Sequence, residues 1–190
     1  FIVGQKARDL GNGTWRYDYA ILNINSDLSG GSFSIPVPAG TTVTNAGFHD
    51  VPYHSGEPYD NTDWTTTVGA TSVTWASPQT FAQNPNSNAL RWGTMYNFWF
   101  DANRPPVSGN ATFGLFKPHT PQSVSVPAQV PSAPGGIPGD LDGDGDVDLT
   151  DLAMLLSDFG CTTPPCVGDI NGDGQTDLAD LAILLANFGA

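Results

Sequence analysis

The chain has 190 residues, of which 39% are hydrophobic, and its formal net charge is −13. This acidity disfavours nucleic acid as a partner, because contacts to phosphates need an excess of basic residues. No apolar run approaches the roughly 18 residues of a membrane span, so the sequence predicts no transmembrane segment. The chain starts at Phe1 without a charged-then-apolar leader. We therefore expect a mature secreted chain, extracellular or at the cell surface, with a fragment of a longer protein as the alternative.

Residues 1–129 consist of short segments in which apolar and polar residues alternate, which is typical of half-buried strands. The segments that show this pattern are 15–21, 33–37, 43–48, 64–68, 73–75, 90–100, 111–115 and 124–126. The fourth and fifth lie on either side of Gly69-Ala70 and predict a hairpin. Because Gly, Pro, Asn and Ser separate the segments, and no helical period occurs before residue 139, we expect a β-sandwich, with a barrel as the alternative.

One long polar segment, residues 48–64, contains His49, His54 and several carboxylates. These groups could bind a transition metal, or two carboxylates could act as the acid and base of glycoside cleavage. Spacing within a loop fixes no geometry, so we favour an ordinary surface loop and expect no catalytic residues. The sequence also lacks a glycine-rich phosphate loop, a nucleophile elbow and a zinc-protease helix.

A proline-rich segment follows the β-domain. It contains Pro127, Pro131, Pro134 and Pro138, with Ala, Ser and Gly in most of the gaps. Because proline cannot donate a hydrogen bond to a strand ladder, we expect a semi-extended linker rather than a packed loop. The predicted organisation is a β-domain at 1–129, a linker at 130–138 and a small α-helical module at 139–190.

The last 52 residues contain an internal repeat. Residues 139–160 and 168–189 are identical at 14 of 22 aligned positions, at an offset of 29 residues. The acidity of the chain is concentrated here, because residues 139–190 hold eleven Asp and no Lys, Arg or Glu. Residues 1–138 hold eight acidic against six basic residues, so the two parts carry −11 and −2 and sum to −13.

Each repeat opens with a twelve-residue loop in which oxygen-bearing side chains alternate with other residues. Ca²⁺ takes about six to eight oxygen ligands, which such a loop supplies from places 1, 3, 5, 9 and 12 and from the backbone carbonyl of place 7. Gly145 and Gly174 occupy place 6, where a sharp turn needs positive φ. The predicted ligands of two Ca²⁺ ions are Asp140, Asp142, Asp144, Asp146, Asp148 and Asp151 in the first loop and Asp169, Asn171, Asp173, Gln175, Asp177 and Asp180 in the second.

An amphipathic helix is expected after each loop. Apolar residues fall on one side of each helix, namely Leu149, Leu152, Leu155, Leu156 and Phe159 in the first and Leu178, Leu181, Leu184, Leu185 and Phe188 in the second. Gly160 and Gly189 stand where helices commonly end. Two helices of about eleven residues are each unstable alone, so we expect them to pack on each other.

The two cysteines, Cys161 and Cys166, lie between the repeats on either side of Thr-Thr-Pro-Pro. In a secreted chain, cysteines so close across turn-forming prolines predict a disulfide. The C-x-x-C pattern of redox and zinc sites is absent.

Two units that open with Gly-Asp and continue into Asp-Leu-Ala-x-Leu-Leu resemble the dockerin module. They differ from ordinary EF-hands because prolines rather than a helix precede each loop and Asp rather than Glu closes it. The resemblance covers residues 139–190 and implies a module that folds on binding Ca²⁺ and docks onto a cohesin-type β-sandwich. In dockerins, places ten and eleven of each loop recognise the partner, which here implies Leu149, Thr150, Leu178 and Ala179. The sequence at 88–100 is similar to uncharacterised β-domains of secreted bacterial proteins.

Two classes of function follow. In the first, the chain is a non-catalytic extracellular assembly protein whose tail docks onto a β-sandwich partner. That partner could be the β-domain of a neighbouring copy, which would give oligomers or filaments. In the second, the chain is a carbohydrate-binding or glycan-degrading component attached to a cohesin-type scaffold. Trp64, Trp75, Trp92 and Trp99 could then line a sugar platform, although alternation places most of them equally well in the core.

Overall fold

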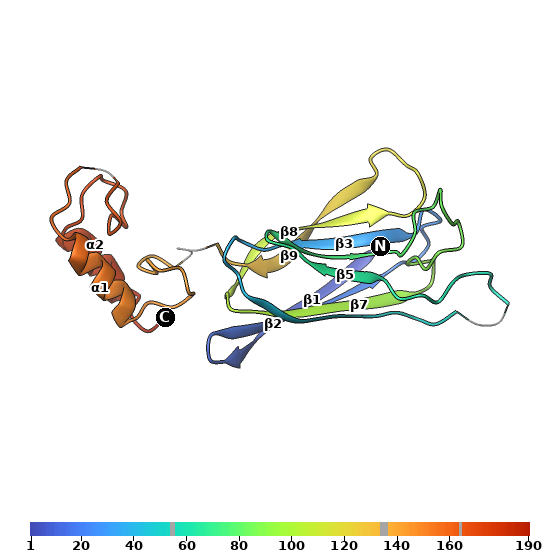
Figure 1. Ribbon diagram of the computed structural model, residues 1–190, viewed down its shortest axis with the longest axis horizontal. Helices are drawn as coiled ribbons and strands as arrows, with labels where there is room; N and C mark the ends of the chain where they lie inside the picture. The colour runs from blue at the N-terminus through green and yellow to red at the C-terminus, as the bar shows by residue number, and fades with distance from the viewer. Residues whose placement is uncertain (54–55, 134–136, 164) are drawn as a thin grey trace.

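A computed structural model describes residues 1–53, 56–133, 137–163 and 165–190. Within them, nine strands are followed by two helices (Figure 1). The strands are β1 (Ile2–Gly11), β2 (Thr14–Leu22), β3 (Gly30–Pro36), β4 (Val43–His49), β5 (Thr65–Val68), β6 (Ser72–Ala76), β7 (Met95–Ala102), β8 (Pro106–Leu115) and β9 (Ser123–Pro131), and the helices are α1 (Leu149–Asp158) and α2 (Leu178–Ala186). The structure is thus mainly β, as the alternating segments predict.

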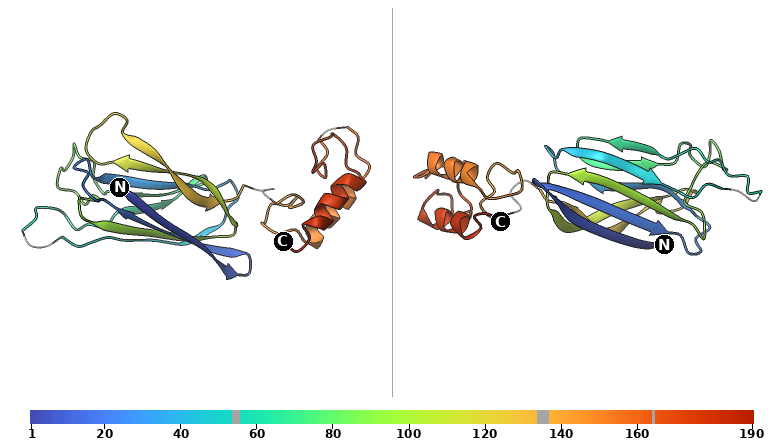
Figure 2. Two further views of the ribbon diagram at one scale, coloured as in Figure 1. Left: turned by 180° about the vertical axis from the view of Figure 1, so that it is seen from behind. Right: turned by 90° about the horizontal axis from the view of Figure 1, so that it is seen from below.

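The strands form two antiparallel sheets that face each other. One sheet has the order β1-β2-β7-β4 and the other the order β5-β6-β3-β8-β9. The predicted hairpin is confirmed, because β5 pairs with β6 and Thr65 lies opposite Ala76. The two helices lie beyond the end of the sandwich at which β9 finishes (Figures 1 and 2).

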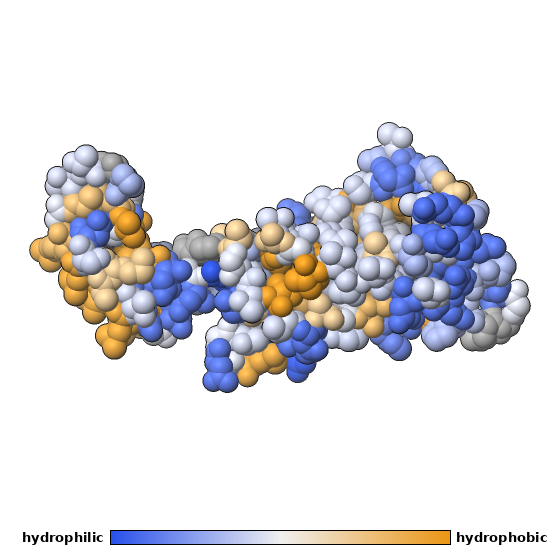
Figure 3. All heavy atoms as spheres, in the orientation of Figure 1, coloured by the Kyte–Doolittle hydropathy of each residue, from blue (hydrophilic) through white to orange (hydrophobic). Residues whose placement is uncertain are grey.

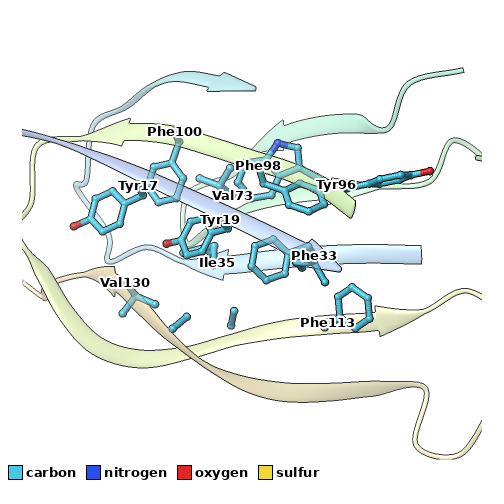
Figure 4. Packing of buried hydrophobic residues seen from close by; sticks show 14 of the residues in the cluster. Tyr17, Tyr19, Phe33, Ile35, Val73, Tyr96, Phe98, Phe100, Phe113 and Val130 are labelled. Atoms are coloured by element: carbon cyan, nitrogen blue, oxygen red, sulfur yellow. The ribbon is translucent and has the colours of Figure 1, made fainter. Parts of the chain in front are cut away.

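The space between the sheets is filled mainly by aromatic side chains (Figure 4). The ring of Phe33, on β3, lies 5.4 Å from the ring of Tyr19 and 5.1 Å from that of Phe98, both of which belong to the other sheet. Trp75 is also completely buried and lies 5.4 Å from Phe98. Aromatic pairs at these separations add to the free energy of burial, so this core stabilises the β-domain without help from the C-terminal residues.

The structure differs from the sequence expectations at three strands. The alternation pattern does not predict β1. β7 begins at Met95 rather than at residue 90, and β9 extends to Pro131. The chain turns before β7 because Gly93 has φ +74° and donates its N–H to the carbonyl of Asn23. β9 pairs with β8 through Pro127 and Pro131, so proline does not end the ladder here. It is tolerated because β9 is an edge strand, where one side needs no donor.

A partly buried ion pair links β2 to β7. The Arg16 guanidinium donates to both carboxylate oxygens of Asp101, and Asn45 Nδ2 donates to Asp101 Oδ2 at 3.1 Å. The hydrogen bond from Arg16 holds the pKa of Asp101 below its ordinary value of 3.8. A carboxylate with a lowered folded pKa stabilises the fold above its unfolded pKa and loses that contribution as the pH falls through the folded pKa.

We expect Asp101→Asn to destabilise the β-domain by about 2 kcal/mol at neutral pH, because Arg16 would lose its charged acceptor. The difference between wild type and variant should shrink as the pH falls below about 4, where Asp101 of the unfolded chain binds a proton, and should be lost once the pH falls below the lowered pKa of Asp101 in the folded protein. Urea unfolding followed by tryptophan fluorescence measures both values. A difference that stays constant down to pH 2 would show that the charge of Asp101 contributes nothing.

The C-terminal unit has a small core of its own. Its buried residues are Val147, which precedes α1, Leu155 on α1 and Leu184 on α2. The predicted disulfide is confirmed between Cys161 and Cys166, whose Cα atoms lie 5.7 Å apart.

No helix in the described part of the chain is long and apolar enough to cross a membrane.

The expected apolar face of each helix is only partly correct. Leu155 and Leu184 are buried, and Leu152 and Leu181 are half-buried. The other members are exposed, namely Leu149, Leu156 and Phe159 on the first repeat and Leu178, Leu185 and Phe188 on the second. Two short helices cover only one narrow stripe of each other, so a wider apolar stripe remains in contact with solvent.

Candidate metal centre

In each acidic loop, side-chain oxygens accept hydrogen bonds from backbone N–H groups of the same loop. In the first loop, the N–H of Gly145 donates to Asp140 Oδ2 at 3.1 Å, and the N–H of Asp144 donates to Asp142 Oδ1 at 3.0 Å. The second loop repeats both bonds, because Gly174 donates to Asp169 at 2.8 Å and Asp173 donates to Asn171 at 2.8 Å. Each loop therefore wraps around the side chain at its first place.

The glycine at place 6 has the backbone conformation that the sequence predicts. Gly145 has φ +104° and Gly174 has φ +88°. A residue with a Cβ is strained in this region, so glycine is required for the turn that brings the later places of the loop back toward the first.

The twelfth place joins each loop to its helix. Asp151 is completely buried and accepts hydrogen bonds from the N–H groups of Leu141 (2.7 Å), Asp142 (3.1 Å) and Asp148 (2.8 Å). Asp148 is the N-cap of α1, accepts from the N–H of Thr150 at 2.6 Å and forms a reciprocal capping box with Asp151. The loop and the first turn of the helix are therefore one hydrogen-bonded unit.

The second repeat has the same arrangement. Asp180 is completely buried and accepts from Ile170 (2.9 Å), Asn171 (3.0 Å) and Asp177 (2.9 Å), while Asp177 caps α2. Burial by itself would raise the pKa of Asp180, but these backbone donors outweigh it and lower the pKa. Asp180 is therefore held as a carboxylate.

The first loop gathers carboxylates closely enough to bind a metal ion. Asp140, Asp142 and Asp144 form one group whose oxygens lie within 4.8 Å of one another, and Asp146, Asp148 and Asp151 form a second. Asp140 is only 4% exposed, and its Oδ1 is buried with no hydrogen-bond partner among the described residues. A buried carboxylate oxygen without a partner is costly, and a bound cation would remove that cost.

Electrostatics in the first loop also favour a cation. Burial raises the pKa of Asp140, and the charges of Asp151 and Asp144 act in the same direction. Burial and neighbouring carboxylates likewise raise the pKa values of Asp142 and Asp146. Close carboxylates destabilise each other's charged forms, and a divalent ion between them would reverse that effect.

The remaining expected ligands lie in the second loop, where amides replace two carboxylates. Asn171 and Gln175 both belong to this loop, and Asn171 Nδ2 donates to Asp173 at 3.1 Å. An oxygen-only donor set with no His or reduced Cys fits a hard cation such as Ca²⁺ or Mg²⁺ better than zinc or copper. A third group, Asp158 with Cys161 and Cys166, contains the disulfide and therefore offers no thiolate.

Asp158 supports the second loop, although the spacing of the loop ligands does not predict this role. It accepts from the N–H of Gly168 at 2.8 Å and from the hydroxyl of Thr176 at 2.8 Å, and both bonds lower its pKa. These contacts join the end of α1 to the second loop. The only sequence signal is that the first repeat has Asp at this place and the second has Asn187.

Residues 48–64 do not form a described metal site. His54 lies outside the described residues, and no group of potential metal ligands within the described ranges includes His49. Asp50 accepts a hydrogen bond from Asn88, and Asp60 accepts from Thr62 at 2.7 Å. These two carboxylates thus hold the loop in shape.

The two loops should differ in affinity, because the first carries six carboxylates and the second four, and ligand charge raises calcium affinity. We expect Asp140→Ala to remove the tighter of two binding phases and Asp169→Ala to remove the weaker one. Calorimetric titration of metal-free protein with calcium measures both phases. A greater loss of the tight phase in Asp169→Ala would reverse the order.

No protein-family model matches this sequence, and no curated protein matches it either.

Proposed function

We propose that residues 139–190 are a calcium-dependent docking module similar to dockerins, and that the chain is a non-catalytic extracellular assembly protein. The observation that supports this most directly is a set of exposed apolar side chains, which we call the apolar strip. It pairs Leu149 with Leu178 (72% and 73% exposed), Leu156 with Leu185 (54% each) and Phe159 with Phe188 (44% each).

The matched exposures argue for a binding surface. Exposing six large apolar side chains to water is unfavourable for a module of 52 residues. Exposed apolar surface of this kind commonly marks a protein–protein contact. Apolar residues gather on the surface over the helices in Figure 3. Because the two repeats fold alike, each presents the same three apolar side chains to solvent.

The apolar strip is linked directly to the acidic loops. Leu149 and Leu178 are the first residues of the two helices, immediately after the capping residues Asp148 and Asp177. A cation that orders the loops would therefore fix the start of each helix. In this proposal calcium acts through the fold and does not touch the partner.

The partner that we propose is a β-sandwich, because the resemblance to dockerins implies one. It belongs either to a cohesin-type scaffold protein or to the β-domain of a neighbouring copy of this chain. The second arrangement is a head-to-tail contact, which produces rings or open filaments.

Sedimentation of the pure chain in millimolar calcium tests docking between copies. We expect oligomers that dissociate in chelator, and we expect Leu149→Asp combined with Leu178→Asp to be monomeric. Aspartate in the first turn of a helix is compatible with the helix dipole, so the helices should persist in this variant.

Val167→Ser is the matched control, because Val167 is 56% exposed in the same module but lies outside the apolar strip. A monomer under all conditions would exclude self-docking and leave the scaffold as the partner. Assembly that survives deletion of residues 139–190 would contradict the proposal as a whole.

A further inference from the structure

A cavity of about 360 Å³ lies at the end of the sandwich opposite the C-terminal unit. It is formed where the connections β2–β3, β4–β5, β6–β7 and β8–β9 converge (Figure 1). Its lining includes Asp27, Tyr53, Glu57, Tyr59, Arg91 and Trp92. The volume is at the lower end of the range for small-molecule sites, about 300–1,000 Å³.

Arg91 is held rigidly in the wall of this cavity. Its guanidinium carbon lies 4.1 Å from the ring centre of Tyr59 and 4.8 Å from that of Phe116. Its Nη2 donates to the carbonyls of Pro85 (2.9 Å) and Ser87 (2.8 Å). Nη1 donates to no described residue, and Nε is buried without a partner among them. The side chain is only 8% exposed, so its position is fixed before any ligand arrives.

Trp92 supplies an apolar platform at the same cavity. It is 71% exposed, although Trp64 and Trp75 are in the core. The turn that displays it is fixed, because Gly93 donates to the Asn23 carbonyl at 2.6 Å and Thr94 Oγ1 donates to the Arg91 carbonyl at 2.6 Å. An exposed indole on a fixed turn, beside hydrogen-bonding groups, can stack against the C–H face of a ligand ring.

The charges at the cavity balance. Arg91 and Lys117 oppose Asp27 and Glu57, and Lys117 is paired with Asp27 at 2.7 Å. The sum of zero gives no net attraction for a charged ligand. Nη2 of Arg91 already donates to two backbone carbonyls. The guanidinium therefore cannot bind a carboxylate through two parallel hydrogen bonds from both terminal nitrogens. Donors and acceptors are both present, which suits hydroxyl groups that donate and accept.

We propose that this cavity binds a neutral carbohydrate, with one sugar ring stacked on Trp92 and its hydroxyls bonded by Arg91, Glu57 and Asp27. The volume accommodates one or two sugar rings. This site is separate from the apolar strip and needs neither the calcium loops nor a partner protein. A negative result for sugar binding would therefore leave the docking proposal unaffected, and the reverse also holds.

Saturation-transfer NMR on the full chain tests the proposal with three neutral trisaccharides, cellotriose, xylotriose and mannotriose, and with trigalacturonate as the acidic comparison. We expect at least one neutral sugar to bind, to change tryptophan fluorescence and to be insensitive to added salt. Trp92→Ala should weaken that binding roughly tenfold through the lost stacking. Glu57→Gln, at an exposed residue that does not threaten the fold, should weaken it several-fold.

Met95→Ala is the matched control, because Met95 is 47% exposed close to Trp92 but does not line the cavity. Binding of the neutral sugar should be unchanged in this variant. Equal binding by wild type and Trp92→Ala, salt-sensitive binding of trigalacturonate alone, or no binding of any of the four sugars would each overturn the proposal.

Discussion

Removal of divalent cations by a chelator should unfold residues 139–190 and leave the β-sandwich folded. Among its described residues, the C-terminal unit has three fully buried apolar side chains, Val147, Leu155 and Leu184. Its disulfide closes only a short loop, so a domain of this size is marginal without a metal. Without metal its charge is −11, and two bound Ca²⁺ ions would reduce this to −7. The β-domain keeps its own aromatic core, to which the metal contributes nothing.

The sequence allows the two parts to be followed separately in the intact chain. All five Trp and all five Tyr lie before residue 100, so tryptophan fluorescence and the tryptophan bands of the near-ultraviolet circular dichroism report on the β-domain alone. The helical signal at 222 nm comes from α1 and α2, the only helices among the described residues. We expect chelation to abolish the helical signal and to leave the aromatic signals unchanged.

Calcium and magnesium provide the control for this experiment. Calcium should restore the helical signal at lower concentrations than magnesium, because magnesium demands near-octahedral geometry and gives up its waters reluctantly. A helical signal that is the same with and without chelator would contradict the prediction. Simultaneous loss of both signals would show that the two parts unfold together.

The strands that the sequence reveals are those with one buried face. Tyr17, Tyr19 and Ile21 alternate because every second residue of β2 points into the core. β1 shows no such alternation, since it is an edge strand with mostly exposed residues, and its pairing with β2 determines it. Alternation can also mislead. Leu90 and Trp92 continue the pattern of β7, yet Leu90 is buried and Trp92 is exposed on a turn.

The acidic loops were predictable because their code is local. Asp140, Gly145 and Asp151 act within one stretch of twelve residues, so spacing alone places them together. The cavity at the opposite end was not predictable, because Asp27, Arg91 and Lys117 are brought there by three connections far apart in the chain. The exposure of the apolar strip was equally unpredictable. The helical period gives the width of an apolar stripe but not how much of that stripe a neighbouring helix covers.

Asp151→Asn should have a large effect on the C-terminal unit despite its small change in size. Both carboxylate oxygens of Asp151 accept backbone N–H groups, and the amide nitrogen of Asn cannot accept any. At least one buried N–H would lose its partner, at a cost of about 1–3 kcal/mol, and the capping box would be broken. The negative charge at the twelfth place of the loop would also be lost. We therefore expect weaker calcium binding in the first loop, by at least tenfold, together with reduced helical signal at low calcium.

Asp158→Asn is the matched control, because the same chemical change is made in the same unit outside the predicted ligand set. Asp158 joins α1 to the second loop through Gly168 and Thr176, so its substitution should lower stability. It should nevertheless weaken first-loop calcium binding less than Asp151→Asn does, because Asp158 contributes only to folding and is not in the predicted ligand set of that loop. Calorimetric titration of both metal-free variants with calcium measures this difference, since Asp151→Asn loses a ligand charge in addition to structural bonds, whereas Asp158→Asn loses structural bonds alone. Equal weakening of the first-loop phase in both variants would mean that Asp151 acts only as a helix cap.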